Sequence, residues 1–88
     1  MEVKYSLHFL SKVEDIFAES DYILRYEKGN FKSGYCVIRE SKVVVVNKYY
    51  PLEGRINCLL EILKSIELDA NLLNPKNFQL YNELKSLG

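Results

Sequence analysis

Residues 33–68 read SGYCVIRESKVVVVNKYYPLEGRINCLLEILKSIEL, and this stretch decides the fold. Two runs typical of β-strands, residues 31–39 and 42–48, precede a helix that begins at Pro51. The second run contains four consecutive valines, whose stiff, branched side chains suit an extended backbone. Glu40 and Ser41 separate the runs, which predicts a tight turn and a β-hairpin. The helix after Pro51 has a buried stripe of Leu52, Ile56, Leu59, Leu60, Leu63 and Ile66.

The residues before this stretch add a helix and a strand. Apolar side chains recur at helical spacing over residues 5–20, which predicts an amphipathic helix. Residues 22–28 alternate apolar and polar side chains, as a half-buried strand does. Gly29 and Asn30 follow, and both tolerate positive φ, so we expect a two-residue turn that pairs this strand with the next one.

Two such turns fix the register of the sheet by counting. Cys36 is then expected beside Ile23 and Val45, and Ile38 opposite Val43. Gly34 is a candidate site for a bulge, which would exchange the faces over part of the strand. The face opposite Cys36 is expected to collect Tyr22, Leu24, Tyr26, Tyr35, Val37, Val44 and Val46.

The end of the chain adds a last helix. Asn74 is a preferred capping residue and Pro75 a preferred first helical residue, so we expect a helix from this point to about Leu87. The predicted order is α-β-β-β-α-α. This order corresponds to an α+β fold in which helices pack on a three-stranded antiparallel meander, and a chain of 88 residues forms a single domain, residues 1–88.

The charge of the chain argues against general nucleic-acid binding, since its formal net charge is zero. Residues 22–50 nevertheless hold six basic and only two acidic residues. An alternative function is therefore the binding of single-stranded nucleic acid on this basic, tyrosine-bearing region of the sheet. The expected contacts are Arg25, Lys28, Phe31 and Lys32.

The cysteines and the apolar runs predict a cytoplasmic protein. Cys36 and Cys58 are expected to be reduced, buried thiols, because neither has a second metal ligand or a partner at a useful spacing. The first ten residues lack the sustained apolar run of a signal peptide. No apolar run approaches the roughly 18–20 residues that span a bilayer.

The run GYCVIRESKVVVVNKYYPLEGRINCLLEIL, residues 34–63, resembles the hairpin and active-site helix of small zincin-type metallopeptidases. The resemblance depends on Gly34, Cys36, Asn47, Pro51, Leu52, Glu53, Arg55 and Ile56. It implies a degenerate scaffold, because residues 60–64 read LEILK where that family has HExxH. The core LRYEKGNFKSGYC also resembles a small uncharacterised bacterial protein family, and that resemblance implies no activity.

Catalysis is not expected. A zinc site needs at least three converging protein ligands, and the chain has one histidine, His8, which we expect on a helix flank. The phosphate-binding patterns GxxxxGK[ST] and GxGxxG are missing from the sequence. We therefore expect no catalytic residue, no metal and no cofactor.

Half-buried tyrosines that close the margin of a small core are the first explanation of the seven tyrosines in a chain without tryptophan, and an interface is the alternative. The function expected from the sequence is protein–protein association, in the first place with a second copy of the chain. The candidate interface residues are Tyr22, Tyr26, Tyr35, Tyr49 and Tyr50.

Overall fold

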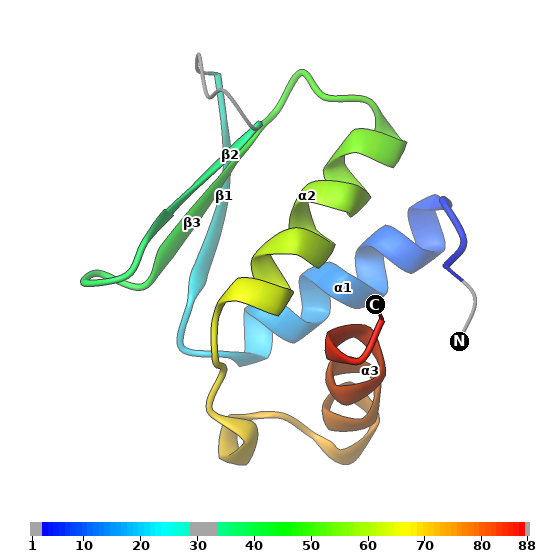
Figure 1. Ribbon diagram of the computed structural model, residues 1–88, viewed down its shortest axis with the longest axis vertical. Helices are drawn as coiled ribbons and strands as arrows, with labels where there is room; N and C mark the ends of the chain where they lie inside the picture. Colours follow the sequence, from blue (N-terminus) through cyan, green and yellow to red (C-terminus); the bar gives the residue numbers. More distant parts are fainter. Residues whose placement is uncertain (1–2, 29–33, 88) are drawn as a thin grey trace.

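The computed structural model describes residues 3–28 and 34–87 and shows three helices packed on a small sheet (Figure 1). The helices are α1 (Leu7–Glu19), α2 (Leu52–Ser65) and α3 (Pro75–Lys85), with a short 3-10 turn, η1 (Ala70–Leu72), before α3. The strands are β1 (Ile23–Glu27), β2 (Tyr35–Ile38) and β3 (Val43–Asn47). The predicted order of elements and the α+β class are confirmed.

The ends of the helices follow from capping. The Ser6 side chain accepts a hydrogen bond from the Phe9 N–H at 3.1 Å, so α1 begins two residues later than expected. The Asn74 side chain accepts from the Asn77 N–H at 2.8 Å, which confirms the predicted cap of α3. Such caps satisfy N–H groups that have no partner inside the helix.

The predicted antiparallel meander is wrong. The strand order is β1-β3-β2, in which β3 lies in the centre, β1 runs parallel to it and β2 antiparallel. Ile23 therefore pairs with Val43 and does not lie beside Cys36. The valine-rich β3 takes the central position, where both of its sides find partners and its side chains are largely removed from water. The expected turn at Gly29 and Asn30 lies outside the described residues.

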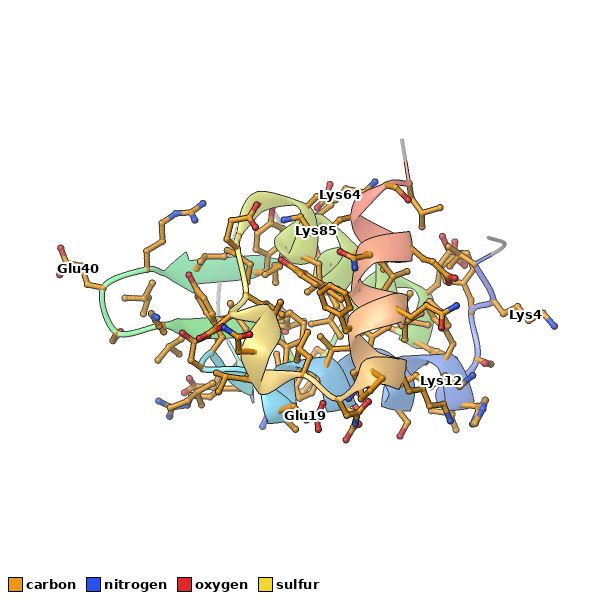
Figure 2. The ribbon with its side chains drawn as sticks, turned by 90° about the horizontal axis from the view of Figure 1, so that it is seen from below. Lys4, Lys12, Glu19, Glu40, Lys64 and Lys85 are labelled. Atoms are coloured by element: carbon orange, nitrogen blue, oxygen red, sulfur yellow. The ribbon has the colours of Figure 1, made fainter. Side chains whose placement is uncertain are left out.

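The hairpin of β2 and β3 has the predicted register. Cys36 pairs with Val45, and Ile38 with Val43. The Lys42 N–H bonds to the Arg39 carbonyl at 3.3 Å, so Glu40 and Ser41 occupy the centre of the turn, with Glu40 at the tip of the hairpin (Figure 2). The Asn47 N–H bonds to the Gly34 carbonyl at 2.8 Å, which continues the same register. Gly34 (φ +83°) therefore inserts no bulge between itself and Ile38.

The helices cover one face of the sheet. All three lie on the same side of it in Figure 1, where α1 packs against β1, α2 against β3, and α3 against both other helices. The covered face is the one expected to be opposite Cys36: Val44 and Val46 are fully buried, and Leu24, Tyr26, Tyr35 and Val37 pack beside them. The largest fully buried side chains are Phe17, Ile16, Ile56, Leu59, Ile62, Leu63, Ile66 and Leu84.

Candidate functional site

The second face of the sheet is apolar on β2 and β3 and carries two charges on β1, and no helix of the described ranges lies over it (Figure 1). Ile23 is 58% exposed and Ile38 46% exposed, although both are large apolar residues. They flank Val43, which pairs with both of them. We call this surface the open face; it consists of Ile23, Arg25, Glu27, Cys36, Ile38, Val43 and Val45.

Two opposite charges lie on the β1 side of the open face. The Arg25 Nε lies 3.3 Å from a carboxylate oxygen of Glu27, and both side chains are about half exposed. An exposed ion pair of this kind contributes little to the stability of a single chain, roughly 0–1 kcal/mol. Its stability role is therefore small, and both charges stay accessible to a partner.

Among the described residues, β1 and β2 form the two edges of the sheet, and β1 is the longer of these strands. The Ile23 N–H bonds to the Lys42 carbonyl at 2.8 Å, and the Lys48 N–H to the Glu27 carbonyl at 3.1 Å. Backbone groups of a strand alternate between its two sides, so the N–H and C=O groups of Leu24 and Tyr26 point away from β3. No strand among residues 3–28 and 34–87 pairs with them there. An edge of this kind is a template for another strand.

A hollow of about 390 Å³ adjoins this edge between α1 and β1. Its apolar wall includes Phe17, Ala18 and Leu24, and Glu14 and Ser20 supply polar groups. The space beside β1 is thus not filled by α1.

Tyr26, in the middle of this edge, is held firmly. Its hydroxyl donates a hydrogen bond to the Glu14 carboxylate, and the Arg55 guanidinium lies 5.3 Å from the centre of its ring. Burial, followed by the contact with Glu14, raises the pKa of the Tyr26 hydroxyl well above its ordinary value. The phenol therefore stays neutral at physiological pH, and the centre of β1 is fixed to α1 and α2.

The predicted interface residues are distributed unequally. Tyr22 is buried in the core, Tyr26, Tyr35 and Tyr50 are partly buried against it, and Tyr49 is 65% exposed. Their role in an interface remains a prediction. Alternation within the strands placed three of these tyrosines on one face correctly. Alternation did not reveal that the helices cover this face. Because they do, the exposed apolar residues Ile23 and Ile38 lie on the opposite face.

The residues expected to contact nucleic acid are only partly within the described chain. Arg25 lies on the open face beside Glu27, and Lys28 is exposed at the end of β1. Phe31 and Lys32 lie outside the described residues. Nucleic-acid binding therefore also remains a prediction.

The resemblance of α2 to the active-site helix of zincins remains a prediction. In α2, Glu61 and Lys64 are exposed and Leu60 is partly buried. Within residues 3–28 and 34–87, no three His, Cys, Asp or Glu side chains lie close enough together to hold a metal ion. His8 is exposed on α1, Cys36 is only partly buried in β2, contrary to the expectation of a buried thiol, and Cys58 is buried in α2. Burial raises the pKa of the Cys58 thiol, which disfavours its reactive thiolate form.

No protein family, curated protein or solved structure matches this chain significantly. The parts of the chain that the structure describes contain no helix that is long and apolar enough to cross a membrane.

Proposed function

We propose that the protein functions without catalysis, by association with a second copy of its own chain along the outer edge of β1. The observation that carries the proposal is the free edge of this strand, with the backbone groups of Leu24 and Tyr26 directed outward. Addition of a strand satisfies such groups with main-chain hydrogen bonds.

A second copy fits this edge for two reasons. Two identical strands related by a two-fold axis run antiparallel, so that each outward N–H of one meets an outward C=O of the other. The strand also carries both signs of charge, on Arg25 and Glu27, and is therefore complementary to itself. Pairing along β1 would join two three-stranded sheets into one of six strands.

Sedimentation velocity over about 1–100 μM, a range that brackets the micromolar affinities of weak complexes, tests the proposal. We expect the mass to rise from that of a 10.3 kDa chain toward twice that value. A single species of monomer mass at every concentration would contradict the proposal.

Two variants at one position separate edge pairing from other contacts. Leu24→Pro removes an outward N–H and leaves the bonds to β3 in place, so we expect it to be monomeric. Leu24→Ala truncates the same side chain but keeps the N–H, and we expect it to dimerise. Circular dichroism checks that both variants fold.

A third variant tests the open face. Ile38 lies on β2, on the far side of the sheet from β1, and is 46% exposed. Ile38→Lys should leave edge pairing intact. Loss of the dimer in this variant, with retention in Leu24→Pro, would place the contact on the open face and overturn the β1 assignment.

A further inference from the structure

The ion pair on β1 restricts the register in which two copies of this strand can pair. Arg25 and Glu27 flank Tyr26, and their side chains lie on the same face of the strand. In two antiparallel copies of β1, outward backbone groups must meet outward groups, so Leu24 and Tyr26 pair only with residues of even number. This restriction leaves a short series of registers, each shifted by two residues.

Only one register near the centre of the strand matches opposite charges. With Tyr26 opposite the partner's Tyr26, each Arg25 lies opposite the partner's Glu27. A shift that brings Leu24 opposite the partner's Tyr26 places the two arginines opposite each other. The reverse shift places the two Glu27 carboxylates opposite each other. Directly opposite charges of unlike sign stabilise an antiparallel pair, and charges of like sign destabilise it.

We propose that the opposite charges of Arg25 and Glu27 set the register of β1 pairing and select an identical chain as the partner. This inference rests on the proposed self-association. The pair contributes little to the single chain, because both side chains are about half exposed. In the dimer each charge faces an opposite charge of the partner as well as its own neighbour.

Charge reversal at the two positions tests whether these charges set the register and the partner. Arg25→Glu makes residues 25 and 27 both acidic, so the homodimer brings like charges together twice. Glu27→Arg makes both positions basic, with the same result. We expect each variant alone to dimerise roughly tenfold more weakly than the unmodified chain, or worse.

A mixture of the Arg25→Glu chain and the Glu27→Arg chain should form a dimer again. In an equimolar mixture, the acidic strand of one variant lies opposite the basic strand of the other, and all cross-strand pairs are of unlike sign. We expect native mass spectrometry to show the mixed dimer almost exclusively. A double variant that carries both Arg25→Glu and Glu27→Arg keeps unlike charges opposite each other across the two strands. It should dimerise like the unmodified chain.

The outcomes separate this inference from the proposed function. An unmodified chain that stays monomeric would contradict self-association itself. If the unmodified chain dimerises, two results would refute only the role of the Arg25 and Glu27 charges. These are single variants that dimerise equally well, or a mixture of them that forms no mixed dimer. Because the two side chains are exposed, none of these variants removes core packing, and circular dichroism verifies their folding.

Discussion

Glu19 joins the end of α1 to the beginning of α3 (Figure 2). Its carboxylate accepts hydrogen bonds from the Asn74 N–H at 2.9 Å, from the Asn74 amide at 3.0 Å and from the Asn77 amide at 2.8 Å. The bond from the Asn74 backbone, followed by that from Asn77, lowers the pKa of Glu19. The charged form of Glu19 therefore holds the two helices together.

We expect Glu19→Gln to lower the free energy of unfolding at neutral pH. The contribution of Glu19 is fully present above the pKa of an unfolded glutamate, about 4.3, and is lost as the pH falls through the lower pKa of the folded state. Urea unfolding at pH 7 and at about pH 3 gives the free energy of unfolding of the unmodified chain and of Glu19→Gln. The difference between these two free energies should be smaller at about pH 3 than at pH 7. Glu61→Gln, at an exposed position on α2, is the control and should leave the free energy of unfolding at pH 7 nearly unchanged.

Tyr50 occupies a space that two glycines leave open. A Cβ atom added at Gly34 would lie 2.4 Å from Cε2 of Tyr50, and one added at Gly54 would lie 2.9 Å from Cδ2. The ring thus packs between the start of β2 and the first turn of α2. Gly34 also has φ +83°, a conformation that side chains with a Cβ disfavour.

Gly34→Ala should destabilise the protein by about 2–4 kcal/mol, through overpacking against Tyr50 and through the left-handed backbone. In a Tyr50→Leu background the clash is relieved and only the backbone cost remains, so the same substitution should cost less. Chemical denaturation of the four chains of this cycle measures the difference. Equal costs in both backgrounds would show that the ring is not the obstacle.

At the scale of the elements, Arg55 fixes the connection between β3 and α2. Its Nε donates to the Tyr50 carbonyl at 3.0 Å and its terminal nitrogen to the Lys48 carbonyl, while the guanidinium faces the ring of Tyr26. One side chain of α2 thus joins the connection after β3 to the centre of β1. A planar guanidinium with several donors is suited to these simultaneous contacts.

We expect Arg55→Lys to cost about 1–2 kcal/mol, because lysine keeps the charge but cannot reach both carbonyls and lie over the ring together. Thermal or urea unfolding measures this loss. Lys64→Arg, an exposed site on the same helix, is a matched control that should be neutral. A neutral Arg55→Lys would show that the charge alone maintains the connection.

The elements differ in how far the sequence predicts them. The helices were predicted to within a few residues, because apolar spacing and caps are local signals. The register of β2 and β3 followed from a tight turn between them. The partner of β1 could not be predicted in this way, because β1 pairs in parallel with β3, which is distant in the sequence, and such pairing leaves no local sequence signal.

At the scale of the molecule, alternation alone assigned side chains to faces correctly, even where the pairing was wrong. Leu24 and Tyr26 share a face with Val44 and Val46 in either topology. The face that stays uncovered depends on helix packing, which the sequence does not encode locally. The tyrosine interface expected from the sequence therefore stays a prediction, and the structure adds Ile23, Ile38 and the edge of β1 as accessible surface.

Amide hydrogen exchange tests the central claim most directly, because it distinguishes the two edges of one strand without any substitution. The N–H of Ile23 bonds to β3, and by alternation so do those of Arg25 and Glu27; they should be protected at every protein concentration. The N–H groups of Leu24 and Tyr26 point outward, and they should exchange fast in dilute solution and slowly at high concentration. Exchange at Leu24 and Tyr26 that stays fast at all concentrations would contradict self-association along β1.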